Sequence, residues 1–359
     1  MKKICLCCLA LLCLTNLFAQ ETVNYKEKKP YKTWVKMAPK LNDEFFKTPE
    51  AIRIGDNVLL YQQTTGGWPK NIYMPAELTE QELEDVLASK DEVNESTIDN
   101  DATSTRLYLA THIEKYRDSA LDGIRYILKA QYPNGGWPQF WPRPKGYYTH
   151  ITYNDNAMVN VMELLREVYE KKAPYEYVPD SICNRACAAF NKGVECILKT
   201  QVVLNGKPTV WCAQHDEHTL APAKARAYEL PSLSGQESDE IVILLMSLPN
   251  PSQEVINCIE NAVEWFKSSK IEGIKKEFFT NDEGKKDYRM VPCTDCPPLW
   301  ARFYTLEDNR PFFSDRDGVK KFDISEIGHE RRNGYSWYNS DGLKVLKKYE
   351  QWKKKNKIQ

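Results

Sequence analysis

The sequence predicts a mainly α protein, an α/α toroid, meaning an incomplete barrel of helical hairpins with long irregular loops and short strands. Two observations predict this fold. Gln63, Gln131 and Gln201 are 68 and 70 residues apart, and each is followed by a turn and an aromatic residue, in QTTGGWP, QYPNGGWP and QVVLNGKPTVW. Strand signals are scarce before residue 270. A repeat of this length is typical of helical units that bury their apolar faces on one another.

One helix of each unit precedes the repeated glutamine. It is clearest in LDGIRYILKAQ and NKGVECILKTQ, where apolar residues recur at i, i+3, i+4 and i+7, and a degenerate fourth copy is NAVEWFKSSK at 261–270. A second helix is predicted at 99–116, 155–171 and 234–248. Each of these segments begins with Asp, Asn or Ser ahead of an apolar run, which is typical of a helix start. Their richness in Leu, Ile, Val and Met predicts that they form the inner ring.

Residues 270–340 have little helical period and are rich in Asp, Arg, Tyr and Pro. We expect long loops and short strands there, and such a stretch within a compact domain is usually functional. A closing helix is predicted at 340–354.

The first 19 residues have the layout of a secretory signal peptide. Lys2 and Lys3 precede a short apolar run, and Ala19 offers a cleavage site. We therefore predict a secreted or periplasmic protein with one domain over 20–359, whose core spans roughly 45–350. Lipidation at Cys13 is the alternative. No later stretch approaches ~20 apolar residues, so no membrane span is expected.

Charge and cysteine content exclude some classes of protein. The chain has 49 basic and 50 acidic residues, a net charge of −1, which argues against general electrostatic binding of nucleic acid. Seven cysteines follow the signal peptide. Cys293 and Cys296 are spaced as in a disulfide or half a zinc site, and because no second pair has ligand spacing, a disulfide or free thiols are favoured.

Polar residues gather at the starts of the predicted inner helices: Asp99, Asn154, Asp155 and Glu237 among them. In a toroid these starts converge at one end of the ring, where several carboxylates could hold a hard cation such as Ca²⁺. Capping of the helices and balance of their dipoles is the competing explanation for each residue taken alone.

Basic residues suggest a site for anions. Lys224 and Arg226 lie in a proline-bounded loop ahead of an inner helix, and Arg302 and Arg316 could bind carboxylates through their planar forks. An ordinary solvated charged loop would explain the first pair equally. Among the aromatic residues, Trp68 and Trp141 are the candidates for the wall of a sugar-binding cleft, and the others are expected to be packing wedges between helices.

Four segments carry a resemblance: IDNDATSTRLYLA at 98–110, GGWPQFWP at 135–142, HITYNDNAMVNVM at 150–162 and AKARAYELPSLSGQES at 223–238. Together they resemble the pectate lyases of polysaccharide lyase family 10, over roughly residues 45–350. The resemblance implies an α/α toroid, a cleft for oligogalacturonate, dependence on calcium, and an arginine that takes the substrate proton. The chain departs from the family at Asp101, where a glycine is expected, and at Gln236.

By this resemblance Arg226 is the catalytic residue, and Asp99 and Asp155 are the calcium and substrate carboxylates. Arg302 and Arg316 resemble the arginines that hold substrate uronates. Lys224, Trp68, Trp141 and Asn154 complete the expected substrate site. The resemblance thus implies an enzyme that cleaves de-esterified polygalacturonate by β-elimination, and we expect it to be a monomer.

The expected base is unusual, because a guanidinium is almost always protonated. Nearby Lys224 and calcium are expected to lower the pKa of Arg226. Two other functions stay open at this point. An inverting glycoside hydrolase would use two carboxylates about 6.5–9.5 Å apart, from Asp99, Asp155 or Glu237. A non-catalytic glycan-binding protein would use the aromatic residues and not Arg226.

Overall fold

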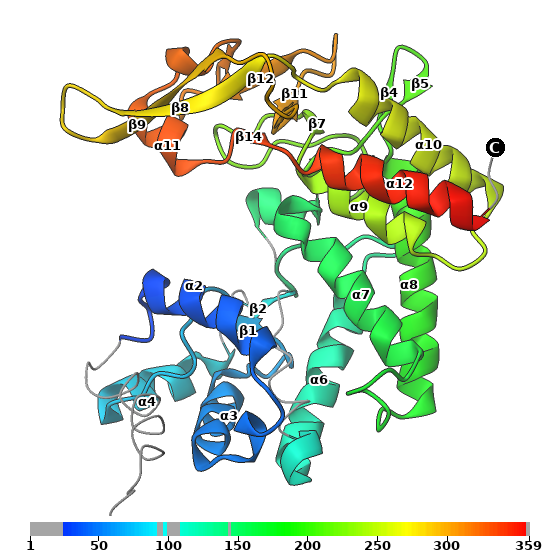
Figure 1. Cartoon of the computed structure of the whole chain (residues 1–359). Helices are drawn as coiled ribbons and strands as arrows, with labels where there is room; N and C mark the ends of the chain where they lie inside the picture. Colours follow the sequence, from blue (N-terminus) through cyan, green and yellow to red (C-terminus); the bar gives the residue numbers. More distant parts are fainter. Residues whose placement is uncertain (1–23, 92–95, 99–107, 143–144, 357–359) are drawn as a thin grey trace, which may run out of the picture.

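The computed structural model describes residues 24–91, 96–98, 108–142 and 145–356. The protein is mainly α, and its long helices form two rows in which each helix packs against the next one of its row (Figure 1). One row consists of α3 (Pro49–Tyr61), α6 (Glu114–Ala130), α8 (Asp180–Thr200) and α10 (Gln253–Ser268), each in contact with the next. A second row consists of α7 (Ala157–Tyr169), α9 (Glu237–Met246) and α12 (Gly342–Asn356). The predicted open toroid of helical hairpins is confirmed.

The remaining helices are short or lie near the N-terminus. They are α2 (Lys28–Met37), α4 (Glu80–Ala88), α11 (His329–Gly334) and the 3-10 turns η1 (Ala38–Lys40), η2 (Phe45–Lys47), η3 (Ser89–Asp91), η5 (Gly146–Thr149), η6 (Asn154–Asn156) and η7 (Ile324–Glu326). The helix predicted at 99–116 falls largely outside the described residues. Its described part is helical only over 108–111, and α6 starts afresh at Glu114, so the prediction runs too far at its C-terminal end.

The repeat is a shared hydrogen-bond pattern. The side-chain amide of each glutamine donates to a carbonyl of its own turn and to a carbonyl of the next helix in the first row. Gln62 bonds Gly66 and Ser119, Gln131 bonds Gly135 and Ala189, and Gln201 bonds Thr209 and Cys258, all at 2.8–3.0 Å. The first member of the repeat is therefore Gln62, and the assignment to Gln63 was wrong by one residue. Gln63 instead accepts a bond from the Ser96 hydroxyl.

The turn glycines explain why the units pack so closely. Gly66 and Gly135 have φ of 94° and 95°, in the region that favours glycine. A Cβ on Gly66 would lie 2.5 Å from the carbonyl oxygen of Asp122, and one on Gly135 would lie 2.0 Å from that of Lys192. Both carbonyls belong to the next helix of the row. Any larger residue would push that helix away.

Four tryptophans lock the same units from inside. The indole N–H of Trp68, Trp137, Trp211 and Trp300 donates to a carbonyl of α3, α6, α8 and α10 respectively, at 2.8–3.0 Å. All four are buried. Trp137 and Trp211 are thus the packing wedges we expected. The prediction that Trp68 lines a cleft is wrong, because its side chain is only 2% exposed.

Short two-stranded pairings connect the helical units. They are β1 (Trp68–Pro69) with β2 (Ser96–Thr97), β3 (Ile151–Thr152) with β6 (Gln214–His215), and β4 (Val203–Leu204) with β5 (Lys207–Pro208), all antiparallel. The β3–β6 pair matters for the site, because it joins the start of α7 to the loop that leads into α9.

Residues 270–340 form a strand-rich layer, in which short strands are joined by loops as the sequence predicts. A hairpin of β8 (Ile274–Thr280) and β9 (Lys286–Pro292) projects to one side in Figure 1. A four-stranded sheet has the order β13 (Lys320–Lys321), β12 (Pro311–Ser314), β11 (Phe303–Tyr304), β7 (Leu233–Ser234), and β10 (Trp300–Ala301) pairs with β14 (Tyr338–Asn339). Phe303, Phe312, Phe313 and Trp337 form its own small core.

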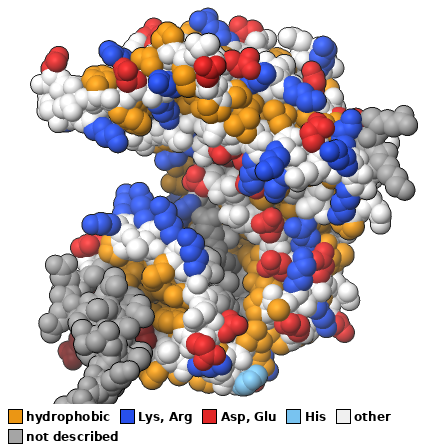
Figure 2. Space-filling view, viewed as in Figure 1, with side chains coloured by type: hydrophobic (Ala, Val, Ile, Leu, Met, Phe, Trp, Pro, Cys, Tyr) orange, Lys and Arg blue, Asp and Glu red, His pale blue; other side chains and the backbone are white. Residues whose placement is uncertain are grey.

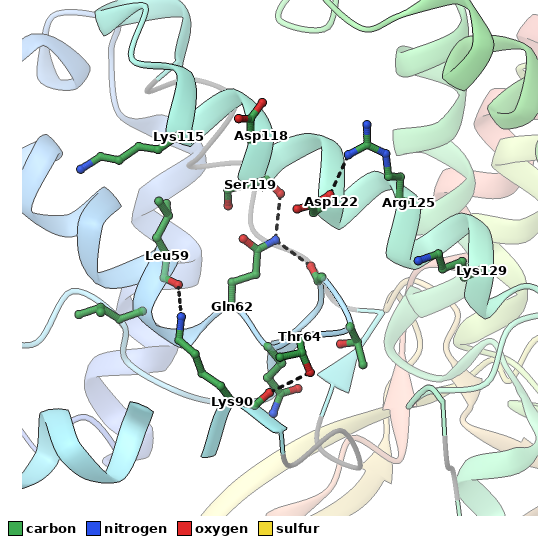
Figure 3. Close-up of a pocket in the computed structure, with 14 residues that line it drawn as sticks. Leu59, Gln62, Thr64, Lys90, Lys115, Asp118, Ser119, Asp122, Arg125 and Lys129 are labelled. Carbon is green, nitrogen blue, oxygen red and sulfur yellow. Dashed lines mark hydrogen bonds and ion pairs between the residues drawn. The ribbon is translucent and has the colours of Figure 1, made fainter. Parts of the chain in front are cut away.

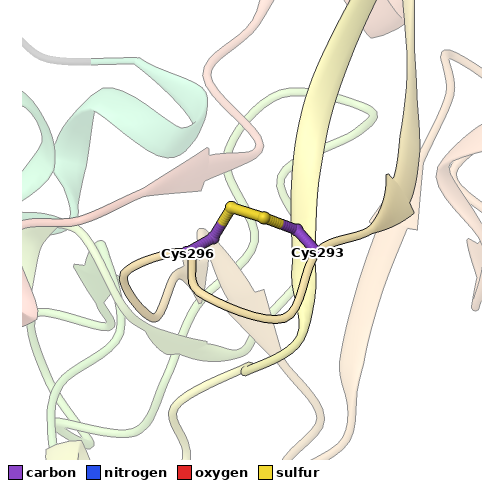
Figure 4. The surroundings of a disulfide bond; sticks show 2 residues. All are labelled: Cys293 and Cys296. Atoms are coloured by element: carbon purple, nitrogen blue, oxygen red, sulfur yellow. A yellow bond between two sulfur atoms is a disulfide. The ribbon is translucent and has the colours of Figure 1, made fainter.

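Cys293 and Cys296 form a disulfide directly after β9, with Cα atoms 5.7 Å apart (Figure 4). This confirms the disulfide, one of the alternatives that the sequence left open for Cys293 and Cys296. The other described cysteines are free, and four of them (Cys183, Cys196, Cys212 and Cys258) are buried. In the described part of the chain, no helix combines the length and apolar character needed to cross a bilayer.

Candidate active site

The starts of α7 and α9 meet at one buried arginine. The Arg302 guanidinium donates from Nη2 to Glu237 Oε1 at 2.6 Å and to Asn154 Oδ1 at 3.3 Å, and from Nη1 to Gln236 Oε1 at 2.9 Å. Glu237 is also bonded by the Ser234 hydroxyl. The convergence of the two inner-helix starts is therefore confirmed. Asp99, at the third start, lies outside the described residues.

Burial changes the role expected of Arg302. Its side chain is 5% exposed and that of Glu237 is 1% exposed, so the pair is sealed from solvent. The charge of Glu237 helps to raise the pKa of Arg302 against the opposing effect of burial. The geometry does not support direct binding of a substrate carboxylate by Arg302, because its Nη atoms are already committed to protein oxygens. Arg302 instead positions Asn154.

Asp155 is displayed by an unusual backbone. Asp155 and Asn156 have φ of 53° and 62°, two successive left-handed residues at the start of α7. Asp and Asn tolerate this region best among non-glycine residues, and such strain is concentrated at functional sites. The Asp155 side chain is exposed and accepts a bond from Asn154 Nδ2 at 2.8 Å. No basic side chain within the described ranges forms an ion pair with it, so its carboxylate is available to a cation.

Arg226 is held by Glu229 in a planar, two-point contact. Arg226 Nε donates to Glu229 Oε2 at 2.7 Å and Nη2 donates to Oε1 at 2.5 Å. The backbone N–H of Arg226 adds a third bond to Oε2 at 3.1 Å, and the Tyr335 hydroxyl donates to Oε1 at 2.7 Å. Glu229 is buried, while the Arg226 side chain is 43% exposed. Nη1 has no bond to any described residue, so this edge of the guanidinium is the one left for a ligand.

The contact fixes the charges of both residues. The hydrogen bonds and charge of Glu229 raise the pKa of Arg226 above its ordinary value. The pKa of Glu229 is lowered by Arg226 and Tyr335, although burial works in the other direction. The expected lowering of the Arg226 pKa by Lys224 is therefore wrong. Lys224 is exposed and forms no ion pair with a described residue.

Tyr335 connects the two arginines. Its ring centroid lies 4.4 Å from the guanidinium carbon of Arg302 and 5.9 Å from that of Arg226. Its hydroxyl reaches Glu229, and burial raises the pKa of this phenol well above its usual range. Arg226 and the Asn154–Asp155 segment therefore belong to one continuous cluster.

The other predicted residues lie at varying depth. Arg316 is exposed and pairs with Glu330 at 3.1 Å. Trp141 is half-buried and packs edge-on against Tyr126, with ring centroids 5.8 Å apart. Tyr147, which was not among the predicted site residues, is also half-buried; burial raises the pKa of its phenol, and the charge of Arg226 opposes that rise. Figure 2 shows the surface hollowed between the part built from α2–α4 and the strand-rich layer, with charged side chains at its edges.

A second hollow is unrelated to this chemistry. It lies between α3 and α6 and is lined by Gln62 and by the charged residues Lys90, Lys115, Asp118, Asp122, Arg125 and Lys129 (Figure 3). None of the predicted site residues lines it. Its central feature is the Gln62 amide, bonded to the carbonyl of Ser119, which holds the two helices together.

Sequence reasoning missed two members of the cluster. Glu229 stood in the A-R-A-Y-E-L motif, and its i+3 spacing from Arg226 was the available signal for an ion pair. No sequence feature indicates that Tyr335 belongs to the cluster, because it lies in an irregular segment far along the chain from Arg226 and Glu229.

The comparisons with known proteins agree with this geometry. The family model described as pectic acid lyase matches residues 62–346. A solved family 10 polysaccharide lyase from Cellvibrio cellulosa is 32% identical, with a TM-score of 0.71, and the match covers 92% of this chain and 99% of that chain. A mutant of the family 10 lyase from the same organism, in complex with trigalacturonic acid, is 33% identical with a TM-score of 0.73 and the same coverage. A search of curated proteins gave no match. Because the family model spans most of the sequence, the chain belongs to the pectic acid lyase family and is a polysaccharide lyase.

Proposed function

We propose that this pectate lyase cleaves de-esterified polygalacturonate by calcium-assisted β-elimination and releases 4,5-unsaturated oligogalacturonates. The observation that carries the proposal is that one cluster contains both a half-exposed arginine, held by the buried Glu229, and an exposed carboxylate at Asp155. The trigalacturonic acid bound by the family 10 relative supports the class of substrate. The protein is proposed to act as a secreted or periplasmic monomer, in keeping with the signal-like first 19 residues.

Asp155 would hold the calcium ion, together with Asp99. The fit is chemical: Asp155 offers exposed carboxylate oxygen, which Ca²⁺ prefers, and Asn154 fixes the orientation of the carboxylate through a 2.8 Å bond. When bound, calcium would neutralise the C6 carboxylate of a galacturonate and so make the neighbouring C5 proton more acidic. Glu237 is not a candidate ligand, because it is buried against Arg302.

Arg226 is proposed to take the C5 proton at Nη1. The electron pair of the C5–H bond then forms the C4–C5 double bond, the C4–O bond breaks, and the leaving oxygen takes a proton from solvent. To act as a base Arg226 must first be neutral, and the carboxylate of Glu229 opposes that change. Activity should therefore rise toward alkaline pH.

Exposed groups are proposed to hold the rest of the chain. Lys224 and Arg316 carry accessible positive charge for further uronate carboxylates, and Trp141 offers a partly accessible aromatic face. Methyl esterification removes those negative charges, so highly methylated pectin should be a much poorer substrate than polygalacturonate.

Absorbance in the ultraviolet tests the reaction class, because β-elimination creates an unsaturated product and hydrolysis does not. We expect product from polygalacturonate that disappears with a chelator and returns with calcium. Asp155→Asn should raise the calcium concentration needed for half-maximal activity. Asp282→Asn, at an exposed turn of the β8–β9 hairpin, is the matched control and should behave like the wild type. Full activity in excess chelator, or reducing ends without ultraviolet absorbance, would refute the proposal.

A further inference from the structure

Side chains of the types that can bind metal ions also gather at the other end of the β3–β6 ladder. The ladder pairs Ile151 with His215 and Thr152 with Gln214. Asp155 follows β3 at one end, whereas His150 precedes β3 and Asp216 follows β6 at the opposite end. The residues at this opposite end play no part in the proposed elimination.

Nitrogen and oxygen donors converge there. One ligand atom each from His150, Asp216 and Glu217 lies within 4.8 Å of the other two, the only such group found in the described part of the chain. His150 Nδ1 is 3.0 Å from Glu217 Oε2, and these side chains are 19% and 15% exposed. His218 Nε2 lies 3.7 Å from Glu217 Oε1 on the solvent side. Three donor residues thus lie close together, and the exposed His218 borders them on the side of Glu217.

The backbone holds these donors in place without using all of their atoms. Asp216 Oδ1 accepts bonds from the N–H groups of His218 and Thr219 and from the Thr219 hydroxyl, at 2.6–3.0 Å. Oδ2 has no hydrogen bond to a described residue. The Asn134 side chain donates to the Glu217 carbonyl at 2.8 Å, which ties the loop to the neighbouring turn. His215 is excluded as a ligand, because its ring nitrogens bond Leu220 O and Cys212 N–H.

We propose that His150, Asp216 and Glu217 bind a divalent transition-metal ion, zinc being the best fit, with His218 as a fourth ligand. Imidazole and carboxylate are zinc ligands at about 2.0–2.2 Å in tetrahedral sites, which places ligand atoms roughly 3.3 Å apart. The His150–Glu217 distance of 3.0 Å is already close to that spacing, and the ligand atom of Asp216 lies within 4.8 Å of both, so side-chain adjustment would complete the site. Calcium takes oxygen ligands, so the histidines separate this site from the calcium site proposed at Asp155.

The competing explanation is a simple ion pair. His150 and Glu217 alone would tie η5 to the loop after β6 with no metal involved. That explanation accounts for the 3.0 Å contact, but it assigns no role to Asp216 Oδ2 or to His218. The two explanations differ in one measurable respect, since only a metal site binds zinc in a way that depends on both His150 and Glu217.

The test is equilibrium dialysis of the untagged full-length protein against zinc chloride, after removal of metal with a chelator, together with thermal melts. The wild type should bind one zinc ion per chain, and its melting temperature should rise with zinc concentration. His150→Gln and Glu217→Gln should each weaken zinc binding at least 10-fold. His329→Gln changes a half-buried histidine that bonds Lys286 O, and it should bind zinc like the wild type.

The outcome does not depend on the lyase reaction. Melts without metal show whether each variant is folded, and Glu217→Gln keeps a neutral group of the same shape if His150→Gln proves unstable. No zinc binding by the wild type would overturn the proposal. Zinc binding that survives in both variants, or that is lost in Asp155→Asn instead, would overturn it equally. Excess calcium should leave the bound zinc in place.

Discussion

Replacing Glu229 with glutamine tests whether Arg226 works as a base. The change keeps the shape of the side chain and an oxygen that can accept from Arg226, but it removes the negative charge from a buried position. Without that charge the pKa of Arg226 falls, so a larger fraction of the guanidinium is neutral at any given pH. A reaction that needs the neutral form should then run faster on the acid side of its pH optimum.

The size of the effect follows from the contact geometry. Unit charges about 4 Å apart interact by about 4 kcal/mol at the effective dielectric constant found near protein surfaces. The Arg226 side chain is 43% exposed, so solvent screening reduces the useful part to roughly 1–2 kcal/mol. Because 1.36 kcal/mol corresponds to a factor of ten, the neutral fraction should increase about 10-fold.

The assay is the pH dependence of kcat/KM for Glu229→Gln and wild type on polygalacturonate at saturating calcium. We expect a profile displaced to lower pH, with a lower maximum because Arg226 is less firmly oriented. Tyr335→Phe is the control: it removes one donor to Glu229 and keeps the charge, so its profile should not move to lower pH. If Glu229→Gln lowers the rate equally at every pH, Arg226 acts as a fixed cation and the base lies elsewhere.

Three further predictions concern stability. Arg302→Met should destabilise the fold by about 3–5 kcal/mol, because it leaves Glu237 buried without its partner, and the double variant with Glu237→Gln should recover part of that loss in denaturant melts. Burial, with Glu240 nearby, raises the pKa of Asp239 to about 7. As the pH rises, the unfolded state therefore releases this proton at a lower pH than the folded state does. The stability of the wild type, measured relative to Asp239→Asn, should fall by up to about 4 kcal/mol between about pH 4 and pH 7. Above about pH 7 the difference should stay constant. A pH-independent difference would refute that assignment. Trp68→Phe should cost about 1–3 kcal/mol, since the carbonyl of Val58 loses its donor, and leave kcat/KM near the wild-type value; a large loss of activity without loss of stability would restore Trp68 to the cleft.

The helical framework could be predicted because repetition is a property of the sequence itself. An apolar helix, a glutamine, a turn and an aromatic residue recur in the first three units, and in each of them the glutamine and the tryptophan make the same kind of hydrogen bond. The error at Gln63 arose because Gln62 and Gln63 are adjacent and chemically identical. Only the hydrogen bonds to Gly66 and Ser119 show which of the two is the repeated residue.

The site was less predictable, because its residues depend on long-range packing. Burial of Arg302 against Glu237 requires β11 to pair with β7, and no pattern in the sequence near either residue predicts that pairing. The same holds for Tyr335, which reaches Glu229 from the segment after α11. Asp155 was found from its place before an apolar run, but the left-handed backbone that exposes it was not.

The three arginines differ in solvent exposure, and this difference determines which of them can contact substrate. The side chains of Arg302, Arg226 and Arg316 are 5%, 43% and 67% exposed, and each is paired with a glutamate. Arg302 is therefore sealed into the scaffold, and its charge is already used in joining the two inner-helix starts.

Arg226 and Arg316 both face water, but they differ in what would be lost on binding a uronate. Arg226 keeps its partner Glu229 and offers the free Nη1 edge, so a ligand meets a side chain that is already oriented, and little conformational entropy is lost. Arg316 must give up Glu330, an exposed pair of small energetic value that salt weakens further. It follows that the contribution of Arg316 to substrate affinity should be small and should decline with ionic strength, whereas the orientation of Arg226 should be far less sensitive to salt, because the carboxylate that holds it is buried.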